Sequence, residues 1–64
     1  MAFLAVETNN RELIASGEIE REHDGNTGYW VAASGVVEYV GLPKGSIKKL
    51  IGKELSWEDD PVEI

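Results

Sequence analysis

The chain contains no cysteine, and proline, histidine and basic residues are scarce in it. Its 64 residues include two prolines, one histidine and six lysines or arginines. Without cysteine, neither a disulfide framework nor a thiolate metal site can form. No apolar run approaches the roughly 18 residues of a membrane-spanning helix. The sequence therefore argues against disulfide-stapled folds, thiolate metal centres and helical membrane spans.

The residues that are present describe a small acidic domain with an apolar core. Twelve acidic residues give a net charge of −6, and 42% of the residues are hydrophobic. That apolar fraction is too high for a disordered chain, and the length suits one domain, expected to span residues 1–64. Residues 1–7 contain no basic segment and their apolar stretch stops at Glu7, so we expect no signal peptide and a cytoplasmic location.

A hairpin is predicted at the N-terminus. Residues 3–8 and 12–16 have the composition of strands, and Asn9 and Asn10 between them tolerate the positive φ of a turn. Both strands are apolar on both faces. This pattern predicts either burial on two sides or one buried face and one exposed apolar face.

The middle of the chain predicts two more strands. Residues 29–33 and 36–40 are rich in aromatic and β-branched side chains, and a tight turn at residues 34–35 joins them. Residues 23–28 are the clearest loop. Within residues 18–22, charged and apolar residues alternate only once, at Ile19. Strands of this length with short connections predict an antiparallel meander.

One short helix is predicted at about residues 43–51. Three apolar residues at i, i+3 and i+4 mark one helical face: Ile47, Leu50 and Ile51. Pro43 suits the first helical position, and Gly52 suits the position just past the end. Ser46 could instead cap the helix and start it later, and the sequence leaves both starts open.

The residues after the helix predict a return to extended structure. Residues 53–57 alternate, which would put Leu55 and Trp57 on one face. Residues 58–61 read as a polar turn, and residues 62–64 read as a short edge strand.

The predicted fold is α+β. It consists of a small, twisted antiparallel sheet of four to five strands in a meander, with the short helix packed on one face. Four residues are expected to oppose the apolar face of the helix: Trp30, Val37, Tyr39 and Trp57. Both tryptophans are interpreted as packing residues rather than as stacking platforms for bases.

Positive charge is concentrated in residues 43–53, which contain four lysines and no acid. These residues form a candidate anion-binding patch: Lys44, Lys48, Lys49 and Lys53. The alternative is a solvated helix face whose lysines favour the negative end of the helix dipole. Direct nucleic-acid binding is disfavoured because the field of the whole chain is negative.

Negative charge is concentrated in residues 54–64. These residues form a candidate partner-binding surface: Glu54, Glu58, Asp59, Asp60 and Glu63. Their carboxylates could meet the lysines and arginines of a basic protein, including one that handles nucleic acid. The alternative is that they only keep a small protein soluble.

Nothing in the sequence predicts an enzyme. His23 is the only histidine, and beside Asp24 we interpret it as a solvated loop residue. No serine lies in a nucleophile elbow, and residues 58–60 do not match a calcium loop. Residues 41–46 differ from a phosphate-binding loop because Lys44 precedes the second glycine. We expect no catalytic residue, no cofactor and no metal.

The C-terminal third carries a family resemblance. Residues 42–64, from Leu42-Pro43-Lys44-Gly45-Ser46 through Trp57-Glu58-Asp59-Asp60-Pro61 to Ile64, are similar to the C-terminal half of short uncharacterised proteins from bacterial and prophage-like genomes. The resemblance implies a bacterial or phage setting and a small accessory role, and it attaches no activity.

Three functions follow from these features. The first is a non-enzymatic accessory protein, of phage or prophage type, that binds a host protein through its acidic surface. The second is a structural homo-oligomer assembled through the N-terminal hairpin, at residues 3–6 and 13–15. The third and weakest is nucleic-acid binding through the lysines of residues 44–53.

Overall fold

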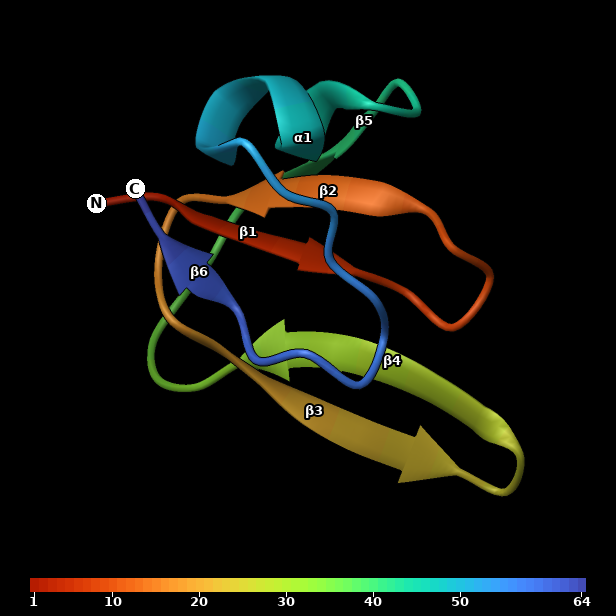
Figure 1. Cartoon of the computed structure of the whole chain (residues 1–64). Coiled ribbons are helices and arrows are strands. Elements are labelled where there is room, and N and C mark those ends of the chain that lie inside the picture. Colours follow the sequence, from red (N-terminus) through yellow and green to blue (C-terminus); the bar gives the residue numbers. More distant parts are fainter.

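The computed structural model describes all 64 residues as six strands and one helix (Figure 1). In chain order the elements are β1 (Phe3–Val6), β2 (Glu12–Ala15), β3 (Ile19–Asp24), β4 (Thr27–Ala32), β5 (Tyr39–Leu42), α1 (Ser46–Ile51) and β6 (Val62–Glu63). All strand pairs are antiparallel, so the fold class is α+β. No helix has the length and apolar character needed to cross a membrane.

The strands form two sheets, and the predicted meander is wrong. One sheet has four strands in the order β5-β2-β1-β6, and the other is the β3–β4 hairpin. After β4 the chain returns to the free edge of β2 instead of pairing with β4. Residues 33–38 make this return without regular structure, and Gly35 adopts a φ of 65° there. The predicted strand at residues 36–40 therefore begins only at Tyr39.

The predicted N-terminal hairpin is confirmed, and its two strands are the centre of the large sheet. The chain turns at Asn10, whose φ is 67°, and the Glu7 N–H donates to the Arg11 carbonyl at 2.8 Å. The strands end at Val6 and Ala15, slightly earlier than predicted.

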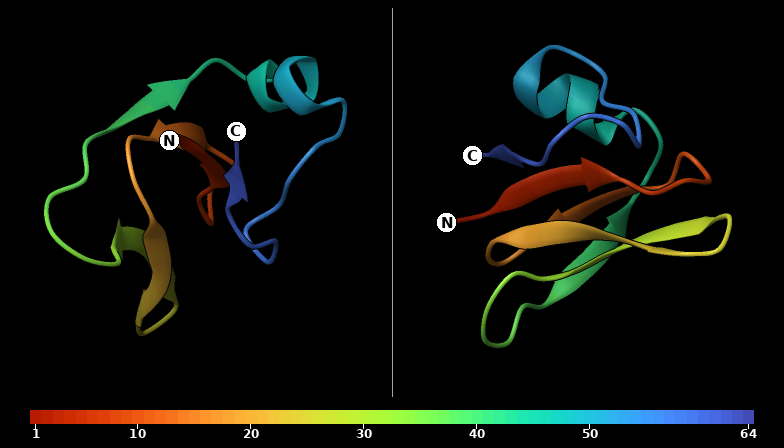
Figure 2. Two further views of the ribbon diagram at one scale, coloured as in Figure 1. Left: turned by 90° about the vertical axis from the view of Figure 1, so that its left-hand side faces the viewer. Right: turned by 90° about the horizontal axis from the view of Figure 1, so that it is seen from below.

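Both faces of this central pair are covered, as Figure 2 shows, with the helix on one side and the β3–β4 hairpin on the other. On the hairpin side the buried residues are Ala5, Leu13, Ala15, Ile19 and Trp30, with Phe3, Val37 and Trp57 partly buried against them. On the helix side they are Leu4, Val6 and Ile47, with Ile14, Leu42, Ile51 and Leu55 partly buried against them. Successive side chains of a strand point to opposite faces, so one apolar strand supplies both cores.

The helix begins later than residue 43. Pro43 precedes it, and its carbonyl accepts hydrogen bonds from the Ser46 N–H at 3.1 Å and the Ser46 Oγ at 2.6 Å. Gly45 occupies the N-cap position with a φ of 92° and offers no side-chain cap. The prediction for the helix end is confirmed, because Gly52 has a φ of 79° and its N–H donates to the Lys48 carbonyl at 2.8 Å.

The predicted packing partners of the helix are wrong. Ile47 packs in the helix-side core, whereas Trp30, Val37 and Trp57 lie with the core on the other face of the sheet. Tyr39 is 56% exposed, and Leu50 of the helix is 57% exposed. With only six residues, α1 buries a single side chain fully, so its predicted three-residue face is reduced to Ile47 with help from Ile51.

The predicted loop at residues 23–28 is mostly strand. His23 pairs with Gly28 and Asp24 pairs with Thr27, which leaves only Gly25 and Asn26 as the turn. Gly25 has a φ of 64°, and glycine at the first loop position favours a tight two-residue hairpin turn.

The segment after the helix crosses from one core to the other. Leu55 packs with the helix-side core and Trp57 with the hairpin-side core, so the two do not share a face as predicted. Residues 53–57 form no strand, because no neighbouring strand pairs with them. The polar turn that follows is held by Asp59, and the predicted edge strand is present as β6 beside β1.

Candidate functional site

The β3–β4 hairpin carries three carboxylates on its outward face. Glu20, Glu22 and Asp24 alternate along β3 with Arg21 and His23, so they share one face of the strand. All three are exposed. Strand geometry separates neighbouring members by about 6.6–6.8 Å between Cα atoms. We call these three residues the acidic row.

No cation neutralises the acidic row. The β4 residues that face it are uncharged: Val31, Tyr29 and Thr27. The only ion pair of the chain joins Arg21 Nη1 to Asp60 Oδ1 at 3.8 Å, and Arg21 lies on the opposite face of β3. Three unpaired carboxylates along one strand repel one another, so the row costs stability rather than adding to it.

The opposite face of β3 is held by Arg21, which packs against two tryptophans that also contact each other. Its guanidinium carbon is 4.9 Å from the centre of the Trp30 ring and 5.0 Å from that of Trp57. Its Nη2 donates to the Trp57 carbonyl at 2.8 Å and to the Asp59 carbonyl at 2.9 Å. Cation–π contacts and charge-assisted hydrogen bonds both strengthen where water is excluded. Arg21 therefore ties the segment at residues 57–60 to the hairpin.

The two tryptophan rings fix the hairpin to the large sheet. The Trp30 Nε1 donates to the Val6 carbonyl at 3.0 Å, and the rings of Trp30 and Trp57 meet edge to face at 5.2 Å. Trp57 lies directly on Gly28, where any Cβ would overlap its ring. The acidic row is thus presented from a strand whose other face is anchored.

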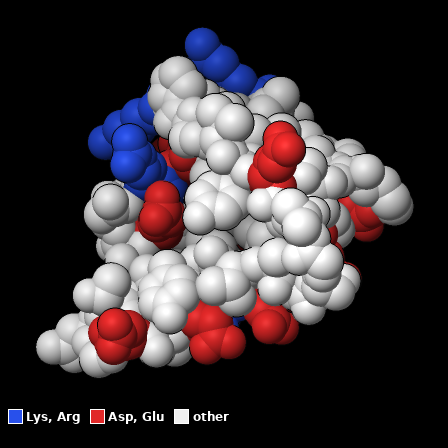
Figure 3. Space-filling model, turned by 180° about the vertical axis from the view of Figure 1, so that it is seen from behind, with Lys and Arg blue, Asp and Glu red and all other residues white.

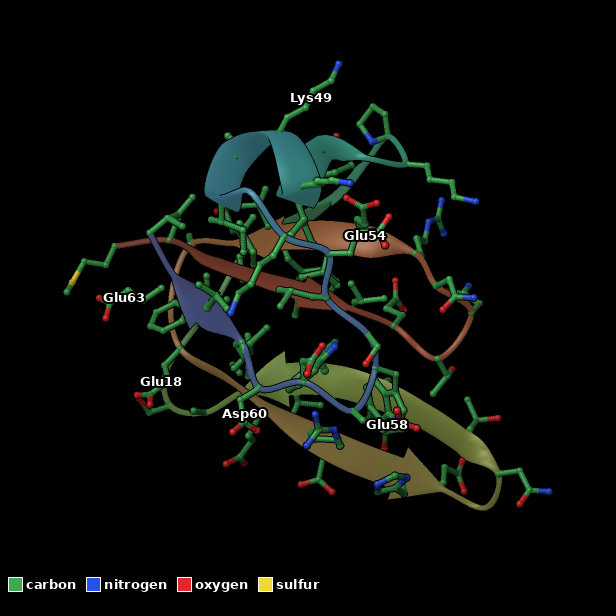
Figure 4. All side chains as sticks on the ribbon, viewed as in Figure 1. Glu18, Lys49, Glu54, Glu58, Asp60 and Glu63 are labelled. Atoms are coloured by element: carbon green, nitrogen blue, oxygen red, sulfur yellow. The ribbon has the colours of Figure 1, made fainter.

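The five acids predicted as a partner-binding surface lie in three places (Figure 4). Glu54 lies below the helix, where it lines a groove together with Lys44 and Lys48. Glu58 and Asp60 project from the segment next to the hairpin, and Glu63 points outward from β6. Asp59 is used internally, because its Oδ2 accepts the Ser56 N–H at 2.7 Å and the Ser56 Oγ at 3.2 Å.

The four predicted anion-binding lysines are also divided. Lys44 and Lys48 line a groove of about 440 Å³ together with Glu12 and Glu54. Two positive and two negative side chains cancel there, which weakens the groove as an anion site. Lys49 points away from the molecule (Figure 4), and Lys53 does not line the groove.

Glu12 of β2 already supplies an anion to the start of the helix. Its Oε1 accepts the Ile47 N–H at 2.8 Å, and its Oε2 accepts the Gly45 N–H at 2.7 Å. The bond from Ile47, followed by the bond from Gly45, holds the pKa of Glu12 below its ordinary value, and the charge of Lys44 lowers it further. The carboxylate thus takes the place of the missing N-cap side chain.

His23 lies in β3 rather than in the predicted loop, and its ring is 5.8 Å from that of Trp57 in an edge-to-face arrangement. No three His, Asp or Glu side chains gather closely enough to share a metal ion.

The chain matches no protein-family model, no curated protein and no solved structure.

Sequence reasoning missed the acidic row, although two signals for it were present. Residues 20, 22 and 24 are acidic at a spacing of two, which is the period of a strand face. Gly25-Asn26 is a dipeptide that favours a two-residue hairpin turn. The cluster of turn-forming residues at 23–28 favoured a loop over both signals. Such residues do not decide between the two, because they occur in strand pairs as well as in loops.

Proposed function

We propose that this protein is a non-enzymatic binding module that docks on a basic surface of a partner protein. The contact surface is the acidic row, Glu20, Glu22 and Asp24. The observation that carries the proposal is that these three exposed carboxylates form no ion pair, while the other face of the same strand is firmly anchored.

The physical argument rests on what a partner would gain. A row of like charges raises the local negative potential, and a basic surface that meets it relieves this repulsion. An anchored strand loses little conformational freedom on binding, which keeps the cost of association small. The net charge of −6 steers a basic protein toward the chain and repels nucleic acid.

The biological setting of the proposal is a bacterial or phage one, in which the partner is a host protein. Lysines and arginines that bind phosphates also bind carboxylates. A host protein that handles nucleic acid is therefore the kind of basic partner that the acidic row suits.

The alternative of assembly through the N-terminal hairpin has lost its supporting observation. Its apolar residues at positions 3–6 and 13–15 are covered on both faces within the chain, and both strand edges are paired. Nucleic-acid binding through the lysines has equally little support, because two of them lie beside Glu12 and Glu54.

The test compares capture of partners by two variants that lose the same charge. The row variant carries Glu20→Gln, Glu22→Gln and Asp24→Asn, and the control variant carries Glu54→Gln, Glu58→Gln and Glu63→Gln. Each tagged protein, with the native chain, is incubated with a nuclease-treated bacterial lysate, and bound proteins are eluted with increasing salt. All changed residues are exposed, so both variants should fold as the native chain does.

We expect one stoichiometric basic protein to bind the native chain and the control variant and to elute with salt, because such contacts are screened. The row variant should retain less than about a tenth of it. Equal capture by the row variant would overturn the assignment. Loss in the control variant alone would move the surface to the acids of residues 54–63.

A further inference from the structure

The outer edge of β5 is an unpaired strand edge. β5 lies at one end of the four-stranded sheet and pairs only with β2. The Ser16 N–H donates to the Glu38 carbonyl at 2.8 Å, which makes this pair a hydrogen-bonded one. Hydrogen-bonded and non-hydrogen-bonded pairs alternate along an antiparallel ladder. Val40 and Leu42 therefore turn their backbone groups toward β2, and Tyr39 and Gly41 turn theirs outward.

The two edges of the large sheet differ in how they are protected. The β6 edge has two residues and follows Pro61, and short edges with proline resist pairing. The β5 edge has four residues and contains neither a charge nor a proline. Its side chains are open to solvent, with Tyr39 56% and Val40 65% exposed.

We propose that β5 pairs with β5 of a second copy of this chain. The two strands run antiparallel across a two-fold axis at Val40 and join two four-stranded sheets into one of eight strands. The proposal is independent of the acidic row, which lies on the hairpin and not on the large sheet.

The register of this pairing follows from the outward backbone groups. With the axis at Val40, Tyr39 of each copy faces Gly41 of the other, and the two pairs exchange four N–H···O bonds. An axis at Tyr39 or at Gly41 leaves some of these groups unmatched, and Pro43, the next outward position, has no N–H to donate. Only the axis at Val40 pairs every outward N–H and carbonyl of the strand.

The side chains are self-complementary in the same register. The ring of Tyr39 faces a residue without a side chain, so it can pack over Gly41 beside the Arg11 side chain, whose Nε is 3.7 Å from the Cβ position of Gly41. Aromatic cover of this kind stabilises glycine at strand edges. On the other face Val40 meets Val40, and β-branched pairs are favourable across strands. Tyr39 and Gly41 lie one residue on either side of position 40, so a two-fold axis at that position pairs each tyrosine with a glycine.

The residues of β5 carry no charge that would oppose a second copy. Seen from behind, much of the surface is uncharged, with Lys and Arg at the top and upper left, several Asp and Glu along the lower and right margins, and acidic side chains also in the upper middle and at left centre (Figure 3). Residues 39–42 carry no charge in either copy, and the cation Arg11 lies beside them, with its Nε 3.7 Å from the Cβ position of Gly41.

A contact of four residues per copy is smaller than a standard interface of about 1,200–2,000 Å². The dimer should therefore be weak, with a dissociation constant of roughly 10 µM to 1 mM. Sedimentation equilibrium of the native chain over that range should show the mass rising from the 7.0 kDa of one chain toward twice that value.

Two lysine substitutions separate pairing from general apolar association. Val40→Lys puts like charges directly opposite each other on the axis and should weaken the dimer at least about tenfold. Val36→Lys is the matched control, because Val36 is 94% exposed and lies outside β5, and it should leave the dimer nearly unchanged.

A third variant and a backbone measurement keep the test decisive. Gly41→Val fills the space that Tyr39 of the other copy needs, while the nearest atom to a Cβ within the chain, Arg11 Nε, is 3.7 Å away. It should weaken the dimer with the monomer fold intact. Amide exchange at Tyr39 and Gly41 should slow as concentration rises.

A chain that stays monomeric to about 1 mM would overturn the proposal and leave this edge to an extended segment of another protein. A dimer that is indifferent to both Val40→Lys and Gly41→Val would also overturn it.

Discussion

The two faces of the central sheet are built by different means. The hairpin face uses large aromatic rings, with Trp30 hydrogen-bonded to the sheet and Arg21 packed against both tryptophans. The helix face has three buried aliphatic side chains and a six-residue helix that takes its cap from Glu12. The first face is anchored by directional contacts and the second by burial of a few side chains. A short helix is unstable alone, so the helix face depends on the sheet more than the hairpin face does.

The largest expected effect is on the hairpin face. Trp30→Ala removes a buried ring, its hydrogen bond to Val6 and one side of the Arg21 site. Such a truncation costs about 3–5 kcal/mol, which approaches the whole stability of a small domain. Urea denaturation should show the loss, with Tyr29→Ala on the outer face of β4 as the control that changes little. Equal effects of the two substitutions would contradict the aromatic anchor.

The helix face is tested by two residues of one helix. Ile47→Ala empties a site that is 1% exposed and should cost about 2–5 kcal/mol. Leu50→Ala changes a residue that is 57% exposed and should cost less than about 1 kcal/mol. Denaturation midpoints of both variants would measure the contrast. A loss of stability at Leu50 as large as that at Ile47 would support the wider apolar helical face that the periodicity predicts.

The cap from Glu12 should add a smaller, pH-dependent contribution. Glu12→Ala leaves the Gly45 and Ile47 N–H groups without this partner and should cost about 0.5–2 kcal/mol, as loss of other helix caps does. Glu38→Gln, which changes an exposed carboxylate, is the control for charge.

The pH dependence has a defined sign. The pKa of Glu12 is lower in the folded chain than its ordinary value of 4.5, so its contribution is complete above that value. It is lost as the pH falls through the folded pKa, because protonation then favours the unfolded state. The difference in unfolding free energy between the native chain and Glu12→Ala should shrink in acid. A difference that stays constant down to about pH 2 would contradict the cap.

The smallest effect concerns the acidic row. Glu22→Gln removes the central charge of the row and should raise the denaturation midpoint slightly in low salt. The gain should disappear as salt screens the repulsion. Glu63→Gln is the control, and a loss of stability at Glu22 would mean that the row is neutralised by a group of the chain.

The sequence predicted best those elements whose signals are local. The first hairpin, the glycine that ends the helix and the edge strand at residues 62–63 each depend on neighbouring residues, and all are present. Pairing partners were harder, because β5 joins β2 across more than twenty residues and nothing in its own composition selects that edge.

The site was harder still, for the same reason. Arg21 reads in the sequence as one charge among the glutamates, and its tryptophan neighbours come from β4 and from a segment 36 residues away. Glu12 likewise reads as an ordinary strand residue, since its helix partner lies 35 residues further on. Such long-range contacts are decided by packing and not by local pattern.

The position of β6 has a consequence for synthesis of the chain. β6 pairs with β1, and the Ile64 N–H donates to the Ala2 carbonyl at 2.8 Å, so two segments far apart in the sequence close the same sheet. Translation adds roughly 5–20 residues per second, so β6 is synthesised several seconds after β1. During that interval the side of β1 that β6 later takes is open. An unpaired strand edge is a template for pairing with another chain, so we expect the nascent chain to be open to such pairing until residues 62–64 have emerged.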